Sequence, residues 1–101
     1  MTNDQNVATT SGADDSRRPL LRRLFRLQHE PAQGAFVLLY PEGMIRLNQS
    51  AAEILKRCDG LRDVADIIGD LEAAFNAVDL AADVKAFIAT AFVRGWLEWR
   101  E

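Results

Sequence analysis

The sequence has little of what catalytic proteins usually need. Its 101 residues include a single cysteine, Cys58, and a single histidine, His29. One cysteine excludes an internal disulfide. A single histidine excludes a His-pair metal site, and no partners for a catalytic triad stand at a suitable spacing from it. There is also no GxGxxG or GxxxxGK[ST] phosphate-binding loop. We therefore predict a chain that is not an enzyme and holds no cofactor.

Long apolar runs are missing as well. No stretch approaches the roughly 20 apolar residues that cross a bilayer. Residues 1–12 have neither the basic start nor the apolar centre of a secretory signal. Together with the cysteine content, this predicts a cytoplasmic protein. The 49% apolar and 27% charged residues are typical of a folded domain.

Charge is unevenly distributed, although the net charge is only −3. The acids stand alone in residues 1–16, and five arginines follow within residues 17–26. Seven acids and one arginine then occupy residues 59–83. Either region could steer a charged partner, and either could be ordinary solvated surface. The sequence leaves both readings open.

The chain begins with a polar segment and then turns to strands. Residues 1–18 show no apolar period, which predicts a disordered tail before a folded domain at 19–101. Three short apolar segments then predict strands at 24–28, 35–40 and 44–47. The segments between them, rich in proline and glycine, predict tight turns and therefore antiparallel neighbours.

Beyond Asn48 the apolar period changes from two to 3.6. Asn48 or Ser50 can cap a helix that ends near Cys58, and Ser50 and Glu53 have capping-box spacing. Asp63 is expected to cap a second helix, and a third is predicted from about Asp83 to Arg94. Residues 96–99 are expected to form an extended or irregular cover. The predicted fold class is α+β, a three-stranded antiparallel sheet followed by three helices, similar to a winged helix-turn-helix.

That similarity makes a winged-helix DNA-binding regulator the alternative function. A recognition helix should present basic or amide side chains to bases. The third helix offers only Lys85, Thr90 and Arg94, and the second helix carries Asp63, Asp66, Asp70 and Glu72. Acids would repel phosphates, so we expect no nucleic-acid binding. A small enzyme would need a catalytic cluster that the sequence does not supply.

The predicted sheet leaves one strand, Gly43–Leu47, at an edge. This edge contains one charge, Arg46, and no proline. An unprotected edge of this kind beside an amphipathic helix is typical of modules that bind peptides by β-strand addition. The alternatives are that residues 96–99 or a second copy of the chain cover the edge. We expect a monomer or a domain-swapped dimer.

The central part of the chain resembles a known family. The run Val37–Asn48 reads VLLYPEGMIRLN, Ser50–Leu55 reads SAAEIL, and an aspartate–glycine turn follows Cys58. These motifs are similar to those of the PqqD family, and the resemblance covers about residues 19–99. In this family a tryptophan is common where His29 stands, and the polar tail lies outside the family pattern.

The resemblance implies a peptide chaperone of pyrroloquinoline quinone (PQQ) biosynthesis, one of the RiPP recognition elements. Such a protein binds the precursor peptide PqqA and presents it to the radical SAM enzyme PqqE. The peptide is expected to add to the third strand and to lie against the third helix. The candidate peptide-binding residues are Gly43, Met44, Ile45, Arg46, Leu47, Val84, Lys85, Ile88 and Phe92.

Overall fold

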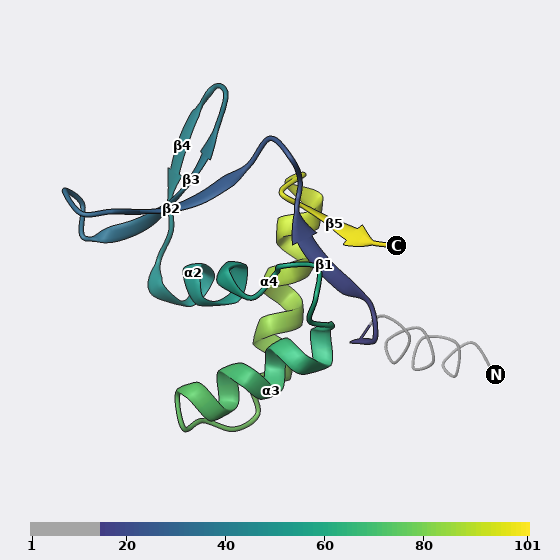
Figure 1. Ribbon diagram of the computed structural model, residues 1–101. Coiled ribbons are helices and arrows are strands. Elements are labelled where there is room, and N and C mark those ends of the chain that lie inside the picture. Colours follow the sequence, from purple (N-terminus) through teal and green to yellow (C-terminus); the bar gives the residue numbers. More distant parts are fainter. Residues whose placement is uncertain (1–14) are drawn as a thin grey trace.

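The computed structural model describes residues 15–101, so most of the tail predicted at 1–18 lies outside the described residues. Figure 1 shows two small sheets arranged around three helices. The strands are β1 (Arg18–Leu21), β2 (Arg26–Glu30), β3 (Ala35–Tyr40), β4 (Gly43–Arg46) and β5 (Leu97–Arg100). The helices are α2 (Gln49–Lys56), α3 (Val64–Ala74) and α4 (Ala81–Val93). The α+β prediction of three antiparallel strands followed by three helices is confirmed.

The three-stranded sheet has the order β2-β3-β4, and both pairs are antiparallel. The strand predicted at 35–40 is confirmed as β3. The strand before it begins two residues later than predicted, at Arg26. The reason is a turn in which the Phe25 N–H donates to the Arg22 carbonyl at 2.9 Å, leaving Leu24 65% exposed. Its apolar residues were therefore mistaken for part of the strand.

The sheet formed by β1 and β5 was not predicted. These strands pair antiparallel, with Arg18 level with Arg100 and Leu21 level with Leu97. The two ends of the described chain therefore lie side by side, as Figure 1 shows. The cover expected at residues 96–99 is for the most part a regular strand. It pairs with β1 and so does not shield β4.

The starts of α2 and α3 are fixed by side-chain caps. The Asn48 carboxamide accepts a hydrogen bond from the Ala51 N–H at 2.8 Å, so of the two predicted caps of α2 Asn48 is confirmed, and the box of Ser50 and Glu53 is wrong. The predicted cap of α3 is confirmed, because Asp63 and Asp66 each accept the other's backbone N–H. Reciprocal bonds of this type satisfy N–H groups that have no partner within the helix.

The core lies between the inner face of the sheet and the helices. Side chains alternate along a strand, so Leu38 and its cross-strand neighbour Ile45 point inward. Leu38, Ile67 and Ala91 have no exposed surface. The adjacent Val37 points to the outer face and is also fully buried, between its neighbours in register, Gln28 and Arg46. Among residues 15–101, no helix is long and apolar enough to cross a membrane.

Candidate functional site

The open edge of β4 is the main candidate site. Within residues 15–101, β4 pairs only with β3, so its other side has no strand partner. Figure 1 shows the β3–β4 hairpin projecting away from α3. The backbone groups on such an edge are free to pair with an additional strand. The edge predicted from the sequence is therefore present in the folded chain.

The register shows which backbone groups face outward. The Leu47 N–H donates to the Phe36 carbonyl at 3.0 Å, which makes this a hydrogen-bonded pair. Such pairs alternate along an antiparallel ladder, so Ile45 also turns its N–H and C=O toward β3. Met44 and Arg46 must then direct theirs to the open side. The edge offers two donors and two acceptors at these two positions.

The side chains of the edge divide between two faces. Ile45 is half-buried and Leu47 is 6% exposed, and both pack into the core on the inner face. Met44 is 49% exposed and Arg46 is exposed, and both lie on the outer face. A strand added to β4 would place its own side chains alternately on the same two faces.

The helix half of the predicted site is arranged differently. Val84 and Ile88 are 3% and 4% exposed and belong to the core. Lys85, Ile88 and Phe92 line a hollow of about 390 Å³. Two hollows border α4, this one and one of about 330 Å³ against α2 and α3, and neither contains a residue of β4. Neither hollow therefore joins the helix residues of the predicted site to its strand residues.

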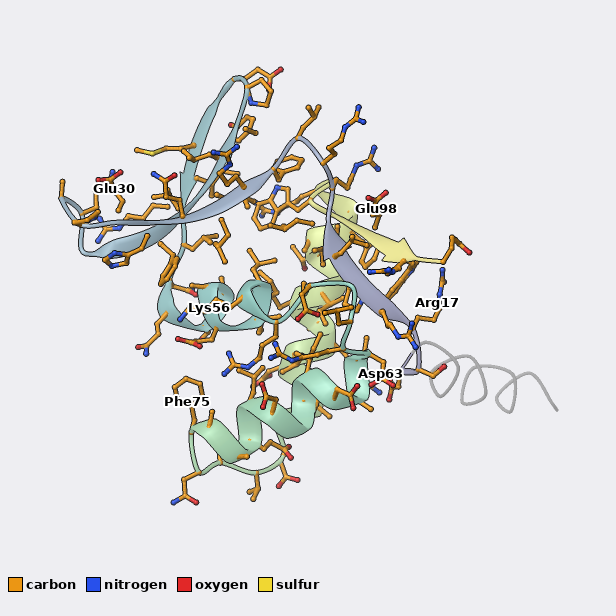
Figure 2. All side chains as sticks on the ribbon, in the orientation of Figure 1. Arg17, Glu30, Lys56, Asp63, Phe75 and Glu98 are labelled. Carbon is orange, nitrogen blue, oxygen red and sulfur yellow. The ribbon has the colours of Figure 1, made fainter. Side chains whose placement is uncertain are left out.

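The hollow on α4 is closed on one side by the N-terminal segment. The Asp15 carboxylate lies 2.9 Å from the Lys85 ammonium, and the Arg17 guanidinium lies 4.6 Å from the Trp99 ring centroid. Trp99 in turn stacks on Phe92 at 4.4 Å. Figure 2 shows Arg17 and Asp63 on the same side of the molecule, where β1 meets the start of α3. No sequence pattern indicates these contacts, because they join residues far apart in the chain.

The acids of α3 mostly serve the fold. Besides the cap pair, Asp70 accepts a 2.7 Å bond from the Arg57 guanidinium, and Glu72 accepts one from the Leu80 N–H at 3.0 Å. Arg57 also bonds Glu53 at 2.8 Å, and this hydrogen bond holds the pKa of Glu53 below its usual range. Part of the acidic surface at residues 59–83 therefore links α3 by hydrogen bonds to the residues that flank α2 and α4.

Cys58 and His29 are the side chains most suited to catalysis or metal binding. Cys58 is part of the core, and His29 packs on a neighbouring ring at the surface. Cys58 is 4% exposed, its thiol donates to the Ile54 carbonyl at 3.3 Å, and burial raises the pKa of the thiol to about 12. His29 is exposed and packs edge-on against Phe36. Within the part of the chain that the structure describes, no three metal-ligating side chains come together.

Comparison with known proteins places the chain in a family. The family model for coenzyme PQQ synthesis protein D (PqqD) matches residues 35–97, which include β3, β4 and all three described helices. A relative from Pseudomonas aeruginosa, named PqqA binding protein, is 53% identical over 79% of this chain and 88% of its own length. One of the same name from Stutzerimonas stutzeri is 51% identical over 81% of this chain and 90% of its own.

The fold has a solved counterpart. The solution structure of the PqqD truncation of Methylobacterium extorquens PqqCD matches with a TM-score of 0.66 and 31% identity. The match covers 79% of this chain and 87% of that one. That protein is described as a functional, stand-alone RiPP recognition element. The family match, the relatives and the shared fold agree with the motifs around β4. The chain belongs to the PqqD family.

Proposed function

We propose that this chain binds the precursor peptide PqqA along the open edge of β4 and presents it to the radical SAM enzyme PqqE. The observation that carries the proposal is the unpaired edge, where Met44 and Arg46 turn their backbone groups outward. The choice of ligand is supported by relatives named PqqA binding protein at about half identity. The role is recognition, and the bond-forming chemistry would belong to PqqE.

Backbone pairing alone is a modest source of affinity. The two outward residues can form at most four hydrogen bonds, each with a net value of about 0.5–1.5 kcal/mol. Micromolar binding requires about 8 kcal/mol after the entropy of association has been offset. Side-chain contacts must therefore provide a large part of the affinity. On the inner face, Ile45 and Leu47 are positioned to support apolar residues of the added strand.

We assign the helix residues to two roles. Val84 and Ile88 are buried and support the domain from the core. Lys85 and Phe92 are half-buried and border the hollow beside Trp99. We propose that they contact peptide residues outside the added strand. Because the precursor peptide is made by ribosomes, the proposal places the complex in the cytoplasm.

The strand-addition mechanism is tested by titrating the ¹⁵N-labelled chain with PqqA and following the backbone amides. We expect saturable shifts centred on Met44 and Arg46, because their N–H groups would acquire partners. The other edge of the same sheet, β2, is an internal control, since Leu27 and His29 face its open side by the same alternation. Shifts confined to β2, or absent from β4 at saturation, would contradict strand addition.

Presentation to PqqE is tested separately. If PqqE is added to the preformed complex, we expect a ternary complex that co-elutes in size-exclusion chromatography with PqqA retained. Release of PqqA on addition of PqqE would instead mean that enzyme and edge compete for the peptide. This outcome would remove the presenting role and leave peptide binding intact.

A further inference from the structure

We infer that Arg46 selects an acidic side chain in the bound peptide, at the position level with it on the outer face of the sheet. The inference rests on the proposed strand addition and specifies which chemistry the edge reads. It follows from the register of β4, from the charges around Arg46 and from the side chains of its neighbours.

The register fixes where the peptide residue would stand. Arg46 is level with Val37 on β3, and Val37 is level with Gln28 on β2. An added strand would extend this row by one residue. Level residues on adjacent strands share a face, and their Cβ atoms lie about 4.5–5.5 Å apart. The row would then read Gln28, Val37, Arg46 and one peptide side chain.

The charges around Arg46 favour an acid at that position. Several cations of the domain have acidic partners at 2.7–3.6 Å, namely Lys56, Arg57, Arg62 and Lys85. Arg46 is among the cations that form no ion pair with any residue in 15–101. The only acid of β2, Glu30, is level with Ala35, in another row and two strands away. The guanidinium is therefore available to a carboxylate from outside the domain.

The neighbouring positions complete the preference. Met44, on the same face as Arg46, is half-exposed and would favour an apolar partner. Ile45 lies between them on the inner face and packs against the core, so its partner should also be apolar. The edge thus fits a segment with an acid level with Arg46 and apolar residues level with Ile45 and Met44. Cross-strand pairs of opposite charge and of apolar residues are both stabilising in sheets.

The test is a charge-swap cycle with PqqA as the probe. Each acidic residue of PqqA is replaced in turn by lysine, and every peptide is titrated by calorimetry into the wild-type chain and into Arg46→Glu. We expect one replacement to weaken binding to the wild type by about two- to fivefold, the range of a cross-strand ion pair. The same peptide should bind Arg46→Glu more tightly than PqqA itself does.

Arg26→Glu is the matched control. Arg26 lies on the same outer face but on β2, level with Leu39, so the same change of charge occurs at the far edge of the sheet. Arg26→Glu should weaken the binding of all peptides to the same extent, and its effect should not depend on which acid of the peptide is replaced. Equal coupling of Arg26 and Arg46, or no coupling at Arg46, would overturn the selection of an acid. Amide shifts at β4 would persist in that case, whereas their absence would contradict the proposed function itself.

Discussion

At the scale of single residues, Cys58 shows how burial decides chemistry. Its thiol is enclosed at the end of α2 and donates to the Ile54 carbonyl. Removal from water raises the pKa to about 12, and the nearby Asp59 carboxylate acts in the same direction. The thiolate is the reactive form of cysteine, so this residue is a small apolar side chain of the core.

We predict that Cys58 makes stability fall at high pH. In the unfolded chain the thiol ionises near its ordinary pKa of 9.0, whereas in the folded chain it stays protonated until about pH 12. The stabilising contribution is therefore complete below pH 9 and declines as the pH rises through this window. Urea unfolding of the wild type and of Cys58→Ala at pH 8 to 11 measures it. The difference in unfolding free energy between the two should shrink with pH; a constant difference would contradict the assignment.

A second residue-scale prediction concerns the core. Leu55 is 2% exposed, and Leu55→Ala should lower the free energy of unfolding by about 2–5 kcal/mol, since it removes buried surface and leaves a cavity. Leu61 is 70% exposed, and Leu61→Ala should change the free energy by less than about 0.5 kcal/mol. Thermal and urea unfolding of both variants give the comparison. Equal losses would mean that Leu55 is not packed as the structure shows.

At the scale of secondary-structure elements, the alternation of hydrogen bonds along β4 predicts that proline will have different effects at adjacent positions. Ile45 directs its N–H to β3, so Ile45→Pro should disrupt the hairpin and cost about 1–3 kcal/mol of stability. Arg46 directs its N–H to the open side, so Arg46→Pro should cost less stability and still weaken PqqA binding.

Arg46→Ala separates backbone from side chain, because it retains the outward N–H and removes only the guanidinium. Its PqqA affinity should lie between those of the wild type and Arg46→Pro, as measured by calorimetry alongside a thermal melt of each variant. If Ile45→Pro proved as stable as the wild type, the assignment of hydrogen-bonded pairs along β3 and β4 would be wrong.

The elements that the sequence predicted are those with strong local signals. β3 is an uninterrupted apolar run between two turns, and α3 carries both its cap at Asp63 and a regular apolar stripe. The edge at β4 followed from the hairpin on each side of β3. β1 was missed because four residues, one of them Pro19, give no pattern of their own. Its pairing with β5 comes from the opposite end of the chain, and local periodicity contains no information on such a partner.

The candidate site, too, could be predicted only where the signal is local in the sequence. The strand residues were predicted from a local hairpin, and the structure places them on an open edge. The helix residues depended on how α4 is rotated against its neighbours, which only packing determines. Lys85 and Phe92 face the hollow beside Trp99, a geometry that depends on the docking of β5. Asp15 and Arg17 were assigned to the tail because nothing in their sequence reports contacts with α4 and β5.

At the scale of the whole molecule, β1 connects the C-terminal strand β5 with the loop before α3. It pairs with β5, and the Pro19 carbonyl accepts a 2.9 Å bond from Gly60, in the loop before α3. Gly60 has a φ of +79°, and a Cβ there would lie 3.2 Å from Arg100 and 3.4 Å from Leu20. The positive φ therefore favours glycine at this position, and a Cβ would in addition press on the Arg100 and Leu20 side chains.

Two N-terminal truncations test this role of β1. Residues 1–14 are polar and show no apolar period, so their removal should leave the unfolding midpoint within about 2 °C of the full chain, a shift expected for well under 1 kcal/mol in a domain of this size. Removal of residues 1–21 deletes β1 and leaves β5 without its partner, Val64 without the Arg17 carbonyl, and Lys85 without Asp15. Since small domains have little stability to spare, we expect the longer truncation to lose its cooperative thermal transition. A cooperative melt near that of the full chain would mean that the β2-β3-β4 sheet and the helices fold without β1, and that the joined ends contribute little to the stability of the open edge at β4.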